Sequence, residues 1–155
     1  MTATQKSLHL FILCLAIVFS MPTFASDDDE AIATCLKSWG KHPFGDKPQY
    51  KTLSSTVKVF GMGGGDPSDT EVTDTPSLVL VNPGLNVMGS TTYEILNPNG
   101  WYCFRTSASV MGDITIKAHC KAHIASTTTG VAVDGTGKQG VTVMGSTEIE
   151  RVGCK

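Results

Sequence analysis

The hydrophobic and polar positions along the chain follow a helical pattern only in residues 26–40. Apolar residues recur there at the spacing of one helix face, at Ile32, Cys35, Leu36 and Trp39. Acidic residues crowd the first turn, where they favour the positive end of the helix dipole. Gly40 then follows at a position where helices often end. We therefore predict one helix here, followed by an irregular connector with two prolines that completes the segment 26–52.

Beyond Leu53 the pattern changes to short apolar runs and to alternation with a period of two, which is typical of strands. SLVLV (77–81) is a continuous apolar run, as expected for a strand that is covered on both faces. DITIKAHCKAHIA (113–125) alternates throughout and predicts the longest strand. Turn sequences such as NPG and NPNG separate the runs. With no helix expected after Gly40, the pattern predicts an all-β fold with one N-terminal helix.

One phrase of strand, glycine and strand recurs along the chain. VMGSTTYEI, VMGDITIKA and VMGSTEIER are near copies, in which Gly89, Gly112 and Gly145 hold the same position, and Gly61 belongs to a more divergent copy. Glycine between two strands allows a sharp bend or a positive φ. A unit repeated every ~20–30 residues predicts a short β-solenoid, in which each repeat covers the apolar side of the next. A small antiparallel β-sandwich is the alternative, because short strands separated by turn signals fit it too.

The series VKVFG, LNVMG, ASVMG and VTVMG resembles short right-handed β-helix domains of bacterial envelope proteins. In the C-terminal domain of Gram-positive cell-envelope stress-response proteins, VFGG phrases recur with a GW step between copies, and Gly100-Trp101 is the parallel here. Bactofilins and head-domain adhesins share the general arrangement. The resemblance covers about residues 56–154 and implies a fold and an envelope location, but no chemistry. Those relatives generally lack this helix and these cysteines, and the stress-response proteins carry membrane helices.

The first 25 residues predict a secretory signal peptide. The apolar run LFILCLAIVFSM is shorter than the roughly 20 residues that cross a bilayer, and it fits the hydrophobic region of a signal. Pro22 breaks the helix, and small residues at Thr23 and Ala25 precede the expected cleavage. We therefore expect an exported chain, periplasmic or extracellular, without a transmembrane helix after cleavage. An uncleaved membrane anchor is the alternative. Residues 53–155 would form the solenoid domain.

Charge excludes two classes of partner. Removing Lys6 with the signal leaves 11 of the 12 basic side chains against 14 acidic ones. The sequence contains neither a basic stripe that would bind nucleic acid nor a polybasic run that would hold anionic lipid. We therefore expect no nucleic-acid partner.

Cysteine use fits an exported protein. Cys14 lies in the apolar run of the signal, and Cys35, Cys103, Cys120 and Cys154 remain, an even number that favours two disulfides. Cys120 and Cys154 follow the glycines of their repeats at similar distances. Stacked repeats would bring them to the ~4.8 Å strand spacing, within the range of a disulfide. Pairing Cys120–Cys154 with Cys35–Cys103 is favoured, and Cys103–Cys120 with Cys35–Cys154 stays open.

Metal and phosphate sites are not expected. His119 and His123 are metal-ligand types, but on one extended strand they would stand ~13 Å apart, at 3.3 Å per residue, with Cys120 on the opposite face. GMGGGD (61–66) lacks the Gly-Lys-Ser/Thr ending of a phosphate loop. Four acidic residues lie close together in one expected loop, Asp66, Asp69, Glu71 and Asp74. They lack the spacing of a calcium-binding loop, so we expect a solvated loop. No cofactor is expected.

GWYCF (100–104) holds the candidate ligand contact. Alternation places Trp101 and Cys103 on one face of a strand and the intervening residues on the other. Trp101 with Arg105 could form a stacking platform for a sugar or a partner protein. The alternative is that Trp101 packs under the N-terminal helix, beside a Cys35–Cys103 bond.

No activity can be read from the chain. It contains no GxSxG phrase, and no order of serine and histidine singles out a triad. We therefore expect a non-enzymatic structural or interaction module of the bacterial envelope, with an envelope protein or glycan as partner and self-association through the edge of the solenoid. A glycan- or small-ligand-binding module is the second hypothesis, and a small secreted hydrolase is the third.

Overall fold

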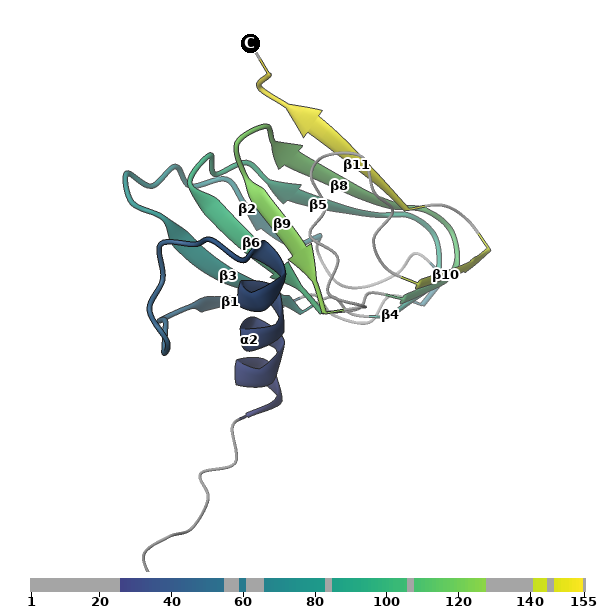
Figure 1. The fold of residues 1–155 in the computed structure, drawn as a ribbon. Coiled ribbons are helices and arrows are strands. Elements are labelled where there is room, and N and C mark those ends of the chain that lie inside the picture. Colours follow the sequence, from purple (N-terminus) through teal and green to yellow (C-terminus); the bar gives the residue numbers. More distant parts are fainter. Residues whose placement is uncertain are drawn as a thin grey trace, which may run out of the picture.

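The computed structural model describes residues 26–54, 59–60, 66–82, 85–105, 108–127, 141–144 and 147–154. The expected signal peptide and the repeat glycines Gly61 and Gly145 lie outside these residues. Within them one helix precedes a series of strands (Figure 1). The elements are α2 (Asp27–Trp39), β1 (Lys51–Ser54), β2 (Ser68–Asp69), β3 (Ser77–Asn82), β4 (Leu85–Met88), β5 (Thr91–Ile95), β6 (Gly100–Phe104), β7 (Ala108–Met111), β8 (Ile114–His119), β9 (His123–Ser126), β10 (Val141–Met144) and β11 (Thr147–Val152).

Helix α2 confirms the predicted helix and is capped at both ends. The Ser26 hydroxyl accepts a 3.2 Å hydrogen bond from the Asp29 backbone nitrogen, and the Asp29 carboxylate accepts one of 3.4 Å from the Ser26 nitrogen. This reciprocal pair satisfies donors that a helix start leaves free. Gly40, at φ +69°, ends the helix and donates to the Leu36 carbonyl. The Tyr50 hydroxyl donates to Asp29 and lowers the pKa of that carboxyl, so the connector returns to the start of the helix.

The described strands form three parallel sheets. Sheet 1 has the order β1-β3-β6-β9, sheet 2 the order β10-β7-β4, and sheet 3 the order β11-β8-β5-β2. The chain visits the sheets in rotation, since β3, β4 and β5 belong to sheets 1, 2 and 3, and β6, β7 and β8 follow the same order. Each recorded strand pair is parallel. The alternative of an antiparallel β-sandwich is therefore wrong, because such a sandwich needs antiparallel neighbours.

The three VMG phrases lie side by side in register. Met88 pairs with Met111, and Met111 pairs with Met144. Beyond the glycines, Ile114 in β8 pairs with Thr91 on one side and with Thr147 on the other. Equivalent positions of the sequence repeat thus occupy equivalent positions in sheets 2 and 3.

Two apolar clusters lie on opposite faces of sheet 1. The interior cluster lies between the sheets and contains Val79, Val81, Tyr93, Ile95, Tyr102, Phe104, Ile114, Ile116, Ala118, Ala122 and Ile124. The outer cluster lies between sheet 1 and α2, which crosses the outside of that sheet (Figure 1). It contains Ala31, Ile32, Cys35, Leu36, Leu78, Leu80, Trp101, Cys103 and Ala125. Both faces of β3 are therefore covered, which confirms the prediction from its continuous apolar run.

One predicted strand is wrong. Residues 113–125 do not form a single strand: β8 ends at His119 in sheet 3, and β9 begins at His123 in sheet 1. Between them a corner closes where the Ala122 nitrogen donates to the His119 carbonyl at 3.0 Å. The alternation of apolar and polar residues continues through the corner, because the even-numbered residues of both strands face the interior cluster. Strand β1 begins at Lys51, inside the expected connector, and most of the VKVFG phrase lies outside the described residues.

In the part of the chain that the structure describes, α2 is short and polar, and no helix has the length and apolarity needed to cross a bilayer.

Candidate functional site

Two disulfides join segments far apart in the sequence. Cys35–Cys103 links α2 to β6, with 5.7 Å between the Cα atoms and both residues fully buried. Cys120–Cys154 links the corner after β8 to the segment after β11, with 5.4 Å between the Cα atoms. Cys154 is exposed. The structure thus has the disulfide pairing that the sequence analysis favours over the alternative.

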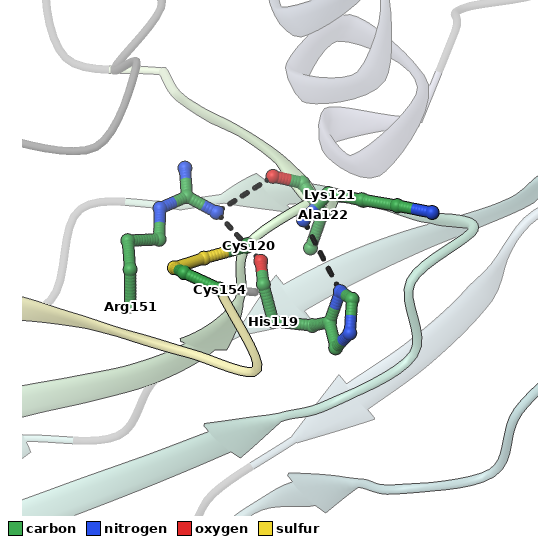
Figure 2. Close-up of a disulfide and its surroundings, with 6 residues drawn as sticks. All are labelled: His119, Cys120, Lys121, Ala122, Arg151 and Cys154. Atoms are coloured by element: carbon green, nitrogen blue, oxygen red, sulfur yellow. Dashed lines mark hydrogen bonds between the residues drawn. A yellow bond between two sulfur atoms is a disulfide. The ribbon is translucent and has the colours of Figure 1, made fainter.

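The surroundings of Cys120–Cys154 form a closed network of hydrogen bonds (Figure 2). One guanidinium nitrogen of Arg151 donates to the carbonyls of His119, at 2.9 Å, and of Ala122, at 2.7 Å. The Lys121 nitrogen donates to Nδ1 of His119 at 3.1 Å. His119 therefore stabilises the turn by accepting hydrogen bonds at both its backbone carbonyl and its ring nitrogen. The ~13 Å separation expected for His119 and His123 assumed one extended strand. Because a corner lies between them, this separation no longer argues against a shared metal ion. Among the described residues no group of three or more His, Cys, Asp or Glu side chains could hold a metal ion.

Trp101 lies at the centre of an aromatic cluster. Its side chain is only 9% exposed. Trp39 and Phe44 meet it edge to face, with ring centroids 5.2 and 5.7 Å away. His123, at the start of β9, stacks on it at 3.7 Å and 17° between the planes. Trp101 thus packs under the helix region, and the exposed ring stacked upon it belongs to His123.

A cavity of about 460 Å³ opens beside this stack. Three segments near the starts of β3, β6 and β9 meet the connector that follows α2. The lining residues are Lys41, His42, Pro43, Pro76, Pro98, Asn99, Trp101 and His123. We call this cavity the Trp101 groove. Its volume falls in the range of small-ligand sites, roughly 300–1,000 Å³.

The charge of the Trp101 groove is one-sided. Lys41 supplies a positive charge beside the imidazole rings of His42 and His123. Among the described lining residues none is acidic. Nδ1 of His42 is buried and has no hydrogen-bond partner in the described part of the chain. A buried nitrogen without a hydrogen-bond partner is unfavourable for the free energy of folding.

One wall of the groove is fixed by Asn97, which is fully buried. Its side-chain oxygen accepts from the backbone nitrogens of Thr73 and Asn99. Its side-chain nitrogen donates to the hydroxyls of Thr73, at 2.9 Å, and Ser77, at 3.0 Å. All four bonds hold the turn that carries Pro98 and Asn99. Nothing in the local sequence marks Asn97 for this role, because its partner Thr73 lies 24 residues earlier.

Arg105 does not join Trp101. Its guanidinium pairs with Asp28 of α2 at 2.8 Å. It lines a second cavity of about 280 Å³, together with Asp27, Glu30, Ala31, Thr34 and Thr127. The candidate stacking platform of Trp101 with Arg105 is therefore divided between two cavities.

Asp69 corrects the expectation of a solvated acidic loop, since it is only 6% exposed. The Lys51 ammonium lies 2.8 Å from one carboxylate oxygen, and the Tyr102 hydroxyl donates to the other at 2.8 Å. Burial, and then the bond to Asp69, raise the pKa of Tyr102. This pair of contacts joins β1, β2 and β6, and sequence reasoning missed it because the partners lie 18 and 33 residues from Asp69.

A scan against family models, a search of curated proteins and a search of solved structures each return no match to the chain.

Proposed function

We propose that the chain is a short β-solenoid that acts as an exported, non-enzymatic structural or interaction module of the bacterial envelope. The observation that carries this proposal is the in-register pairing of the three VMG phrases in sheets that the chain visits in rotation. Repeats stacked in this way seal one another's apolar sides and leave long, regular outer faces for contact.

The outer face of sheet 3 supports a contact role. Lys117 in β8 is the register neighbour of Glu94 in β5 and of Glu150 in β11, and all three side chains are at least partly exposed. Opposite charges on neighbouring strands stabilise a sheet by a few tenths of a kcal/mol to about 1 kcal/mol. Such a ladder makes a flat polar surface. Among the described strands, β11 lies at one edge of this sheet and β2 at the other, and an edge can pair with another chain.

Export is supported by the two disulfides, which form and persist in oxidising compartments. It is also supported by the signal-like residues 1–25. The covering helix, held by Cys35–Cys103, would then be formed after cleavage and oxidation.

Two measurements test this proposal. The full chain, expressed with a C-terminal tag in a Gram-negative host, should be recovered outside the cytoplasm, beginning at Ser26 and with both disulfides formed. The mature protein should then sediment with purified bacterial envelopes in a saturable way. A chain that keeps Met1 and free thiols would contradict export, and a protein that stays in the supernatant at every envelope concentration would contradict the interaction role.

A ligand-binding module is the second candidate function, because the Trp101 groove is concave, lined by rings and contains one lysine with no acidic residue among the described lining residues. These are features that bind small ligands. This function is compatible with the first, since a module can hold its partner through such a groove.

A further inference from the structure

We propose that the Trp101 groove binds a sugar residue that carries a carboxylate, as in an acidic polysaccharide. This inference rests on the proposed interaction function and names the ligand class of its site.

The lining of the groove suits the apolar face of a sugar ring. His123 stacks on Trp101 with nearly parallel planes, so the exposed imidazole lies above a larger buried ring. Pro43, Pro76 and Pro98 add rigid apolar surface around it. Sugar rings present one face of C–H groups, which packs against such surfaces, while their hydroxyls remain at the open side. Binding pockets combine apolar and aromatic linings with a few placed polar groups in this way.

The charge of the groove selects an anion. Lys41 provides a positive charge, and none of the described lining residues is acidic. A carboxylate would pair with the Lys41 ammonium, and hydrogen bonds between charged groups are stronger than those between neutral groups.

The groove is held in shape before any ligand arrives. Cys103, two residues after Trp101 in β6, is bonded to Cys35 of the helix. Trp39 and Phe44 support the indole edge to face. The four hydrogen bonds of Asn97 hold the opposite wall. A site that is already ordered loses little conformational entropy on binding, which favours affinity.

The test uses a tetramer of galacturonic acid and the same tetramer with its carboxylates methyl-esterified. Titration calorimetry of the mature, oxidised protein at physiological salt should give at least about tenfold tighter binding for the acidic tetramer, as one charged hydrogen bond predicts. Lys41→Gln should lower the affinity for the acidic tetramer by at least about fivefold, and His123→Ala should weaken both tetramers by removing the stacking surface. Circular dichroism should show that both variants stay folded.

Lys37→Gln is the matched control, because Lys37 is an exposed lysine in the last turn of α2 that does not line the groove. It should change the affinity by less than about twofold. The proposal is overturned by equal affinity for the two tetramers, by no binding of the acidic one, or by equal effects of Lys37→Gln and Lys41→Gln. If those results came with retained envelope sedimentation, this inference alone would fall. Loss of both would remove the proposed function as well.

Discussion

Gly112 lies directly against the carbonyl group of Gly89, so a Cβ atom at position 112 would overlap that carbonyl. Both glycines have positive φ, +113° at Gly89 and +127° at Gly112. Beside this contact the Gly89 nitrogen donates to the Met111 carbonyl at 2.9 Å, and the Thr91 nitrogen to the Asp113 carbonyl at 2.9 Å. The glycine at position 112 of the repeat therefore has a physical cause: its corner stacks on the Gly89 corner and leaves no room for a side chain.

Replacing Gly112 with alanine should lower the free energy of unfolding by about 2–4 kcal/mol, from overlap with backbone and from the unfavourable φ. Urea unfolding followed by circular dichroism measures this change. Gly45→Ala is the matched control, because nothing lies within 4 Å of a Cβ at Gly45. It should shift stability by no more than about 0.5 kcal/mol. Equal effects of the two variants would show that the corners are not stacked.

Tyr102→Phe tests the buried network at Asp69. The variant removes the hydroxyl that donates to the Asp69 carboxylate, so a buried acceptor loses a partner, at a loss of about 1–3 kcal/mol in the free energy of unfolding. Tyr50→Phe removes a similar bond to Asp29, which is exposed, and should have a smaller effect. The ranking of the two variants in urea unfolding would be reversed if Asp69 were solvated.

Stability should fall at alkaline pH because of buried tyrosines. Burial, with a smaller contribution from Asp66, raises the pKa of Tyr93 from 10.0 to about 12. Above pH 10 the unfolded chain loses the tyrosine proton while the folded chain keeps it, so stability declines as the pH rises from about 10 towards 12. Urea unfolding over this range measures the decline, and Tyr93→Phe should make it shallower. An identical pH dependence for wild type and variant would contradict burial of the Tyr93 hydroxyl.

The two disulfides should respond to a reductant in a fixed order. Cys154 is exposed, whereas Cys35 and Cys103 are fully buried, so mild reduction should open Cys120–Cys154 first. Alkylation and mass spectrometry should then find label on Cys120 and Cys154 alone. The partly reduced protein should lose about 2–4 kcal/mol of stability. Label on Cys35 or Cys103 at the earliest times would contradict the covering position of α2.

Local signals in the sequence predicted the helix and the strand-rich remainder. The helix has its cap residues, Ser26 and Gly40, within the same short segment as its apolar face, so neighbouring residues alone define it. The burial of β3 on both faces was also predicted, because four consecutive apolar residues leave no exposed face.

The two disulfides were predicted although their partners lie far apart in the sequence, but three other features that depend on distant partners were not. The corner between His119 and His123 escaped notice because alternation continues across it, and its bonds come partly from Arg151 in β11. The acidic loop was read as solvated because the partners of Asp69 come from other strands. The Trp101 groove is assembled by four separate segments. The sequence singled out two of its lining residues, Trp101 as a ligand contact and His123 as a metal-ligand type, but not their association.

Nuclear Overhauser contacts in the labelled mature protein can establish whether the VMG phrases stack as parallel, in-register neighbours. We expect contacts that join Tyr93 to Ile116 and Ile116 to Ile149, with each step towards the C-terminus on one strand matched by a step in the same direction on the next. Contacts that run in opposite directions along these strands, or that join other pairs of segments, would contradict it.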